Sequence, residues 1–372
     1  MTRELRMTRQ GGAFASSGLR LLAFARFAGI KEQFCMSQSL PILKALKTRF
    51  WDQQPFILSH LLTARCNADC RSCLWKRPAD SREDELSTEG VRQLYRDAAA
   101  AGFRSLVLWG GEPLLRQDAG ELLRFAAEVG LDSTLITNGW WLAERHADVL
   151  PHISRLILSV DALDSQHDQI RRCPGLFRRL EAGLEMTRKL YPRVKILLIC
   201  VLSRLNREAP EPLAHFAKRY GVSLLFQQMN LEDYGFADRA TDASDIALSP
   251  EESQMLSAKI LELRRGGARV RDSNGYLRRI GETSFTYRCH YKKVLLRVEP
   301  NGDLLDCTQN AKPMANLRTA RLRDVLASER YRQFIKVAEQ CHRCRDVGVI
   351  ELSHIWEGRP EAILNAIREL GR

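Results

Sequence analysis

Seven of the ten cysteines in this 372-residue chain fall into two spaced groups, and these groups constrain its fold and chemistry most strongly. The first group, Cys66, Cys70 and Cys73, is a C-x3-C-x2-C run after the apolar stretch 56–63, which reads as a strand. Soft thiolates suit zinc and iron–sulfur sites. Three thiolates on one loop can hold three irons of a cubane 4Fe–4S cluster and leave one metal position open for a substrate or cofactor. The alternative is a structural zinc loop, for which His60 is the one nearby candidate for a fourth ligand.

The second group has the spacing C-x17-C-x33-C-x2-C and consists of Cys289, Cys307, Cys341 and Cys344. Segment 299–303 is a turn signal between two strand-like runs, 294–298 and 304–305. We expect this hairpin to bring Cys307 close to Cys289, so that four thiolates close the coordination sphere of a second cluster. A zinc ribbon is the alternative, because its ligand chemistry is the same. Three further cysteines, Cys35, Cys173 and Cys200, fit neither group.

Apolar runs alternate with amphipathic helical stretches along the middle of the chain. The expected strands are 56–63, 105–108, 133–137, 155–160, 194–202 and 223–226, and the expected helices are 89–101, 119–129, 142–150, 176–190, 209–220 and 250–265. This order gives about six β-α units, which predicts a parallel sheet curled into a full or partial barrel. In such barrels the reactive groups lie at the carboxyl ends of the strands.

Polar motifs follow successive strands of this predicted barrel. Gly110-Gly111-Glu112-Pro113 follows the second strand, where the glycines would let the backbone approach a ligand and Glu112 would offer a carboxylate to an ammonium group. Thr137-Asn138-Gly139 ends the third strand, and Ser159-Val160-Asp161 ends the fourth, with Arg171 further on. Taken singly, each motif is also compatible with an ordinary turn.

With these motifs in place, the sequence resembles the radical S-adenosylmethionine (radical SAM) superfamily over about residues 56–230. The C-x3-C-x2-C loop after the first strand and Gly-Gly-Glu-Pro after the second are signatures of that family. The resemblance implies that Cys66, Cys70 and Cys73 hold a 4Fe–4S cluster whose open iron is chelated by SAM. It also implies a set of SAM-binding residues, for which our candidates are Gly110, Gly111, Glu112, Asn138, Ser159, Arg171, Ser203 and Asn206.

The second cysteine group resembles the twitch form of the SPASM extension, which carries one auxiliary 4Fe–4S cluster. The expected fold is therefore α/β, a partial (β/α)6 barrel of radical SAM type followed by a small cysteine-rich domain. The expected divisions are an N-terminal basic amphipathic extension (1–50), the barrel (51–250), a bridging helix and loop (251–285), the twitch/SPASM-like domain (286–346) and a C-terminal helix (347–372).

The resemblance implies an enzyme that cleaves SAM reductively to a 5′-deoxyadenosyl radical, which removes hydrogen from a substrate. We expect a small-molecule substrate such as a sugar, cyclitol or lipid, with the auxiliary cluster in electron transfer, as in a dehydrogenase. A radical SAM peptide maturase and a non-catalytic, zinc-stabilised binding protein are the alternatives. No catalytic acid or base can be named. The expected electron donor is of the flavodoxin or ferredoxin type.

Charge and the N-terminal segment bear on partners and location. The net charge of +12 comes from 57 basic and 45 acidic residues that are scattered along the chain, and no nucleic-acid-binding module is visible. Segments 18–36 and 43–51 contain both basic and apolar residues. Each could form an amphipathic helix on an anionic membrane surface, and the alternative is a helix that packs against the barrel. Because clusters and free thiols need reducing surroundings, we expect a cytoplasmic protein, with peripheral membrane contact as a variant of that expectation.

Overall fold

The computed structural model describes residues 55–73, 77–78, 84–229, 244–280, 282, 287–307, 310–338, 340–341 and 344–370. The predicted basic segments 18–36 and 43–51 lie outside these residues. In the described part of the chain, no helix is both long enough and apolar enough to cross a membrane.

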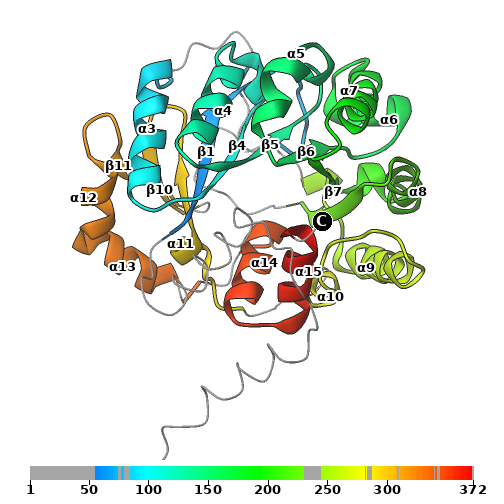
Figure 1. The fold of residues 1–372 in the computed structure, drawn as a ribbon. Coiled ribbons are helices and arrows are strands. Elements are labelled where there is room, and N and C mark those ends of the chain that lie inside the picture. The colour runs from blue at the N-terminus through cyan, green and yellow to red at the C-terminus, as the bar shows by residue number, and fades with distance from the viewer. Residues whose placement is uncertain are drawn as a thin grey trace, which may run out of the picture. The chain divides into compact units, whose positions relative to one another are not determined.

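Six parallel strands, in an order that follows the sequence, make up one side of a nine-stranded sheet (Figure 1). They are β1 (Ile57–Thr63), β4 (Ser105–Gly110), β5 (Asp132–Thr137), β6 (Arg155–Ser159), β7 (Lys195–Leu202) and β8 (Ser223–Gln228). The edges of the sheet are β8 and a C-terminal strand, so the barrel is open. The prediction of a partial (β/α)6 barrel is therefore confirmed.

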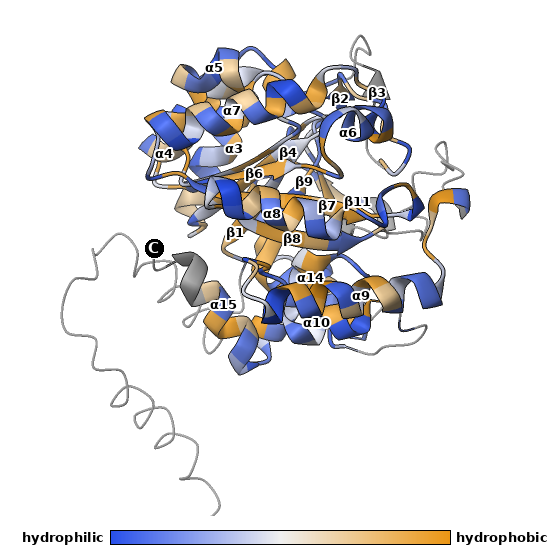
Figure 2. Ribbon diagram, turned by 90° about the vertical axis from the view of Figure 1, so that its right-hand side faces the viewer, coloured by the Kyte–Doolittle hydropathy of each residue, from blue (hydrophilic) through white to orange (hydrophobic). Residues whose placement is uncertain are grey.

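Helices cover the outer face of these strands. They are α3 (Thr88–Ala100), α4 (Ala119–Glu128), α5 (Leu142–Val149), α6 (Asp164–Arg171), α7 (Leu176–Leu190) and α8 (Pro210–Tyr220). Figure 2 shows α5 and α7 on one side of the strands and α9 (Pro250–Arg265), α10 (Asn274–Arg279) and α14 (Val347–Trp356) on the other. Short 3-10 helices lie at Pro113–Leu115, Leu150–His152, Arg204–Asn206 and Ser244–Ile246.

Alternation along the strands separates the two faces of the sheet. In β7, Ile196, Leu198, Cys200 and Leu202 are buried in the core formed with the outer helices. The intervening residues Leu197, Ile199 and Val201 are half-buried and therefore face the inside of the barrel. This alternation of fully buried and half-buried residues is expected for a strand that is covered by helices on one face only.

The cysteine-rich part continues the same sheet. Strand β9 (Leu295–Val298) pairs with β1 in parallel, and β10 (Asp303–Cys307) and β11 (Asn310–Asn316) follow in antiparallel order. The turn between β9 and β10 places Gly302 at φ +87°, a conformation that favours glycine. The remaining elements are the strand pair β2 (Arg65–Cys66) and β3 (Arg77–Pro78), and helices α11 (Tyr291–Val294), α12 (Leu322–Ala327), α13 (Glu329–Ala338) and α15 (Pro360–Leu370).

The C-terminal segment differs from its prediction. We expected one helix over 347–372, but two helices, α14 and α15, occupy this region. Gly358 has φ +79° and Pro360 begins α15, so the chain turns between them. A left-handed glycine followed by a proline ends one helix and starts another.

Candidate functional site

The three-cysteine loop begins where β2 ends, at the carboxyl end of β1. Cys66, Cys70 and Cys73 are free thiols and only partly exposed. The loop docks on the end of α6, where the Asp69 amide donates to the carbonyl of Arg171 at 3.1 Å and the Cys70 Sγ lies 3.8 Å from the same oxygen. The chain can turn away directly after this contact because Arg172 adopts a left-handed conformation (φ +48°).

The surroundings of these thiols fit a metal cluster. Burial raises the pKa of Cys66 to about 12 and that of Cys70 to about 11. The Cys66 Sγ accepts hydrogen bonds from the Ala68 amide at 3.4 Å and from the Asn138 Nδ2 at 3.9 Å. Donors aimed at a buried sulfur are suited to a thiolate that carries charge as a ligand. The donor set of three soft sulfurs on one loop fits a 4Fe–4S cluster with one open iron.

The two glycines after β4 let the chain press against the start of this loop. A Cβ at Gly110 would lie 2.2 Å from the Thr63 carbonyl oxygen, and one at Gly111 would lie 2.1 Å from that of Arg65. The Gly111 and Glu112 amides donate to those same two oxygens, each at 2.8 Å. Both Cβ positions therefore face the chain's own backbone, and the expected approach of a ligand to the backbone of these glycines stays a prediction.

Glu112 is fully buried. Its carboxylate accepts hydrogen bonds from the Thr137 hydroxyl at 2.7 Å, the Asn138 amide at 2.8 Å and the Leu114 amide at 3.0 Å. Burial raises its pKa, although these three donors oppose the shift. This carboxylate therefore joins the ends of β4 and β5, and its expected role toward an ammonium group stays a prediction.

Asp161 and Arg171 form a buried ion pair beside the cluster loop. The Arg171 Nε donates to the Asp161 Oδ2 at 2.8 Å, and the two side chains are 13% and 3% exposed. Although burial opposes the shift, the Asp161 carboxylate and the Cys70 sulfur hold the pKa of Arg171 above its usual range. The Asp161 Oδ1 also accepts from the Val201 amide at 3.0 Å, so this carboxylate ties α6 to β7. Ser159, the last residue of β6, is half-buried.

Ser203 and Asn206 form a capping box around the short helix after β7. The Asn206 Oδ1 accepts from both the amide and the hydroxyl of Ser203, at 2.7 and 3.1 Å. Its Nδ2 donates to the carbonyls of Asp161 and Val201, each at 2.9 Å. Two acceptor and two donor positions use the whole capacity of an asparagine side chain. Asn206 is therefore placed to brace this end of the barrel.

Two residues near the cluster loop were not identified as site residues from the sequence. Asn67 and Cys173 meet where the Asn67 Nδ2 lies 3.8 Å from the Cys173 Sγ. Cys173 and Leu176 also pack with Ala68, Cys66, Cys70 and Trp140 in one small apolar cluster. These contacts join residues about a hundred positions apart, so no local pattern in the sequence announces them.

Three cysteines of the second group influence the charge state of Tyr287. Burial, followed by the charges of the Cys344, Cys289 and Cys341 sulfurs, raises the pKa of this phenol. Cys289 and Cys344 are buried and Cys341 is half-buried. Cys307 ends β10, and its backbone pairs with Asn310, while its side chain lies outside the described part. The hairpin expected between 294 and 305 is present.

The end of β8 and helix α10 contact the C-terminal part of the chain. The buried Tyr276 hydroxyl accepts from the Gln228 amide at 3.1 Å and lies 3.4 Å from the Arg345 carbonyl, which ties β8 to the C-terminal part. Gln227 is half-buried at the end of β8, and Arg278 is exposed on α10. Asn230 lies outside the described residues.

The inside of the barrel is apolar toward the carboxyl ends of its strands. Residues that pair across neighbouring strands point to the same face of the sheet. One row of side chains that points into the barrel runs from β1 to β7 and consists of Leu61, Trp109, Ile136, Ile157 and Leu197. The next row holds Ser159, Ile199 and Leu225, and the last pairs Val201 with Gln227. The basic side chains Arg297, Arg155 and Lys195 belong to the row at the opposite end, which also holds Ser59 and Val107.

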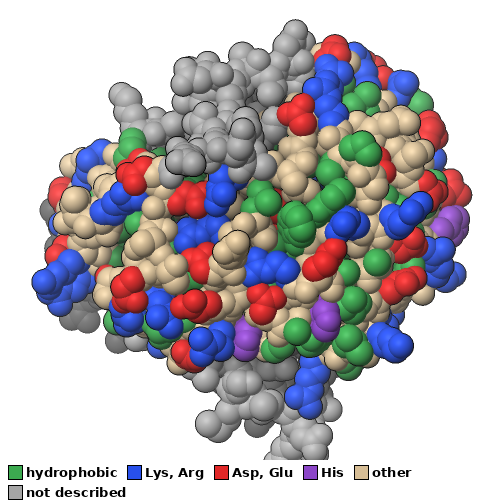
Figure 3. All heavy atoms as spheres, turned by 90° about the horizontal axis from the view of Figure 1, so that it is seen from above, with side chains coloured by type: hydrophobic (Ala, Val, Ile, Leu, Met, Phe, Trp, Pro, Cys, Tyr) green, Lys and Arg blue, Asp and Glu red, His purple; other side chains and the backbone are tan. Residues whose placement is uncertain are grey.

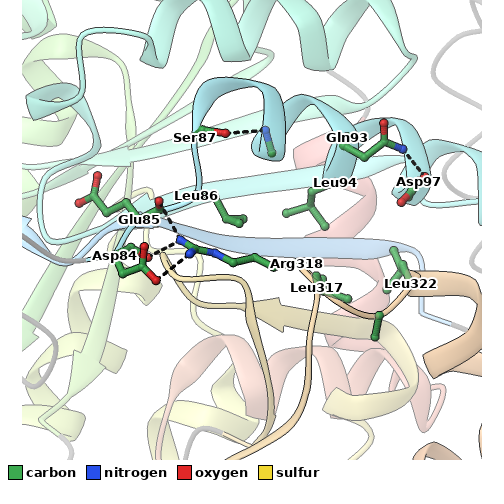
Figure 4. A pocket seen from close by; sticks show the side chains of 12 residues that line it. Asp84, Glu85, Leu86, Ser87, Gln93, Leu94, Asp97, Leu317, Arg318 and Leu322 are labelled. Carbon is green, nitrogen blue, oxygen red and sulfur yellow. Dashed lines mark hydrogen bonds and ion pairs between the residues drawn. The ribbon is translucent and has the colours of Figure 1, made fainter.

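A separate groove of about 530 Å³ lies between α3 and the segment before α12 (Figure 4). Arg318 reaches across it and donates to the Asp84 carboxylate at 2.6 Å and to the backbone carbonyls of Asp84 and Glu85 at 2.7 and 2.9 Å. The Glu85 side chain in turn accepts from the Arg65 Nε at 3.1 Å, one residue before Cys66. The groove therefore marks a joint between the cysteine-rich part and the cluster loop.

Comparison with known sequences agrees with this geometry. The sequence model of the radical SAM superfamily matches residues 61–217, and that of the SPASM iron–sulfur cluster-binding domain matches residues 289–345. An AdoMet-dependent heme synthase of Methanosarcina barkeri is 35% identical over 138 residues, which is 36% of this chain and 40% of the relative. The chain thus spans less than half the length of that relative.

Two relatives match over more of their length. A PqqA peptide cyclase of Xanthomonas campestris pv. campestris is 27% identical over 76% of this chain and 77% of the relative. A GTP 3′,8-cyclase of Syntrophomonas wolfei is 28% identical over 70% of this chain and 82% of the relative.

Solved structures share the fold. Streptococcus suis SuiB bound to precursor peptide SuiA has a TM-score of 0.59 at 16% identity, and the match covers 84% of this chain and 76% of SuiB. The enzyme anSMEcpe with bound AdoMet has a TM-score of 0.61 at 19% identity, covering 85% of this chain and 98% of the neighbour. Both domain matches and the barrel lead to one conclusion. The chain belongs to the radical SAM superfamily and carries a SPASM iron–sulfur cluster-binding domain, a pair of domains that implies SAM and two 4Fe–4S clusters as cofactors.

Proposed function

We propose that this enzyme modifies a peptide by radical chemistry. The observation that carries the proposal is the apolar, uncharged inner face near the carboxyl ends of the strands, where Ile199, Val201 and Leu225 lie beside Gln227. A peptide segment offers apolar side chains and neutral amides, which such a surface can bury and hydrogen-bond. Recognition of a triphosphate calls instead for basic side chains or for a helix N-terminus.

The relatives support a peptide over the sugar, cyclitol or lipid that we expected from the sequence. The PqqA peptide cyclase aligns along three quarters of this chain, a length that exceeds the barrel alone. Among the three sequence relatives described above, the heme synthase has the highest identity, but its alignment covers little more than a third of the chain. The peptide alternative of the sequence analysis is therefore our proposal for the substrate class.

In this proposal Cys66, Cys70 and Cys73 hold the SAM-binding cluster, and Cys289, Cys307, Cys341 and Cys344 hold the auxiliary one. When bound, the first cluster and SAM together supply the 5′-deoxyadenosyl radical. The chain positions SAM with the backbone of Gly110 and Gly111, with Ser159 and with the Arg171 guanidinium. Glu112, Asp161 and the Ser203–Asn206 box hold those elements in place, and the apolar inner face excludes water from the reacting carbon. An electron donor of the flavodoxin or ferredoxin type would reduce the clusters.

The test is an anaerobic assay of the reconstituted enzyme with SAM, dithionite and a synthetic peptide library. A matching panel of polyols, phospholipids and nucleotides is run in parallel. We expect a subset of the peptides to stimulate release of 5′-deoxyadenosine and to show a changed mass in the same reaction. Stimulation and conversion confined to the polyol, lipid or nucleotide panel would refute the peptide proposal and leave the family assignment intact.

A variant pair adds a check on where the substrate binds. Ile199→Asp places a charge on the inner face, and Leu190→Asp places the same charge on a residue that is 52% exposed at the end of α7. We expect the first change to abolish stimulation by the peptide and the second to leave it unchanged. Equal activity of the two variants would show that the substrate does not use the inner face.

A further inference from the structure

Asn67 and Asn138 form an amide pair behind the first cysteine of the cluster loop. The Asn138 Nδ2 donates to the Asn67 Oδ1 at 2.9 Å and also lies within hydrogen-bonding distance, 3.9 Å, of the Cys66 Sγ. The Asn67 Nδ2 in turn donates toward the Cys173 Sγ at 3.8 Å. The pair thus connects the end of β5, the cluster loop and the segment after α6.

The orientation of the Asn138 amide is fixed by its other partners. Its Oδ1 accepts from the Trp140 amide at 2.9 Å, and its backbone amide donates to the buried Glu112 carboxylate at 2.8 Å. Asn138 is only 5% exposed. Because the oxygen is already held by an N–H group, the Nδ2 has to face Asn67 and Cys66, which assigns donor and acceptor without ambiguity.

A donor in this place acts on the charge of the sulfur. When a cluster takes up an electron, negative charge increases on its sulfur ligands, and an N–H group aimed at such a sulfur stabilises the reduced form. Hydrogen bonds to ligand sulfurs are one of the means by which proteins set the reduction potential of iron–sulfur clusters. The Ala68 amide gives Cys66 one such bond from the loop itself, and Asn138 adds a second from a different element.

We propose that Asn138 is a positioning residue that raises the reduction potential of the SAM-binding cluster through its contact with Cys66, and that Asn67 and Cys173 hold its amide in place. This inference rests on the assignment of Cys66 as a cluster ligand and is independent of the substrate. The sequence-based expectation that Asn138 contacts SAM stays a prediction, which the SAM affinity of the variants tests. A cluster that is easier to reduce accepts the electron for SAM cleavage from a weaker donor.

The test measures the potential of the cluster whose electron paramagnetic resonance signal changes on addition of SAM, in wild type and variants. Asn138→Ser keeps a side-chain oxygen for the Trp140 amide but is too short to reach Cys66. We expect a tenfold lower reduced-to-oxidised ratio at fixed potential, which for one electron is about 59 mV in the negative direction. Asn138→Asp adds a negative charge and should lower the ratio further. Asn67→Ala frees the Asn138 amide and should have a smaller effect of the same sign.

Iron content and SAM affinity separate tuning from other roles. We expect all three variants to bind as much iron as wild type and to bind SAM with affinity within about threefold. Gln166→Ala, which removes an exposed amide on α6, is the matched control and should leave the potential unchanged. An unchanged potential in Asn138→Ser with iron retained would overturn the inference. Loss of iron from every variant would also overturn it, because a tuning residue is dispensable for assembly, as would loss of SAM binding at an unchanged potential.

Discussion

At the scale of single residues, the site consists of buried polar side chains that form hydrogen bonds and ion pairs within the protein. Glu112 accepts three hydrogen bonds, Asp161 holds Arg171 and the Val201 amide, and Asn206 uses all four of its positions. Buried polar groups stabilise the fold only when every group has its hydrogen-bond partner. A group that loses its partner still carries the full free-energy cost of removal from water. The geometry of the candidate site therefore depends on these residues holding one another in place.

The Asp161–Arg171 pair gives the first prediction at this scale. Asp161→Ala leaves the Arg171 guanidinium buried without its carboxylate, and breaking a buried pair costs about 3 to 5 kcal/mol of unfolding free energy. Glu329→Ala removes one partner of an ion pair that is 59% exposed on both sides, and such exposed pairs contribute little to stability because water screens them. Anaerobic urea denaturation of both variants measures the contrast. Losses of equal size would contradict the structural role given to Asp161.

A second prediction concerns the pH dependence of stability through His60. Burial, followed by the charge of Arg116, lowers the pKa of His60 to about 3, while in the unfolded chain a histidine titrates near 6.5. Between these values the unfolded state binds the proton and the folded state does not. Stability from this group is therefore complete above pH 6.5 and falls as the pH decreases toward 3, with a slope of about 1.4 kcal/mol per pH unit.

The variant His60→Asn removes this contribution, so its unfolding free energy should approach that of wild type as the pH falls from 6.5 to 5. Tyr95→Phe is the matched control, because it removes the hydrogen bond to the His60 Nδ1 and keeps the imidazole buried. We expect this control to run parallel to wild type over the same range. A constant difference between His60→Asn and wild type would show that His60 is not responsible for the slope.

At the scale of elements, local pattern in the sequence predicts most of the barrel. All six parallel strands and the helices α3, α4, α5, α7, α8 and α9 lie within one or two residues of their expected bounds, because each buries an apolar face with a clear period. Helix α6 was missed, since only His167 and Ile170 of its eight residues are buried and its sequence is otherwise polar. The pairing of β9 with β1 was also missed, because it joins segments more than two hundred residues apart.

The turn after β4 carries a prediction at this scale. A Cβ at Gly111 would meet two backbone oxygens of the Thr63–Arg65 segment, at 2.1 and 2.6 Å, and backbone cannot move aside without moving the cluster loop. We expect Gly111→Ala to reduce the iron bound at Cys66, Cys70 and Cys73, measured by iron analysis after anaerobic reconstitution. Gly130→Ala is the control, since Gly130 also has an unusual φ of +86° but has open space around its Cβ position. That control should cost about 1 kcal/mol of stability and leave the iron content unchanged.

At the scale of the whole molecule, the barrel and the cysteine-rich part share one sheet and a common joint. Strand β9 covers the edge of β1, and Arg318 connects the segment before α12 to Asp84 and Glu85. Acidic and basic side chains are interspersed on the face that Figure 3 shows. The SPASM model matches residues 289–345, the same region that the cysteine spacing indicated in the sequence. That this region and the barrel share one sheet could be seen only in the structure.

This continuity leads to the last prediction, for an enzyme that lacks one auxiliary ligand. Cys344 is buried and lies outside the strands that join the two parts. We therefore expect Cys344→Ala to keep the barrel folded and to lose one of the two clusters, so that iron falls from about eight to about four atoms per chain, the content of one 4Fe–4S cluster. Because Cys66, Cys70 and Cys73 are untouched, the variant should still cleave SAM when dithionite supplies the electron.

A Cys70→Ala variant is the opposite case, which should retain the auxiliary cluster and lose SAM cleavage. If Cys344→Ala kept all its iron, or if it lost SAM cleavage while keeping the SAM-sensitive cluster signal, the independence of the two cluster sites would be wrong.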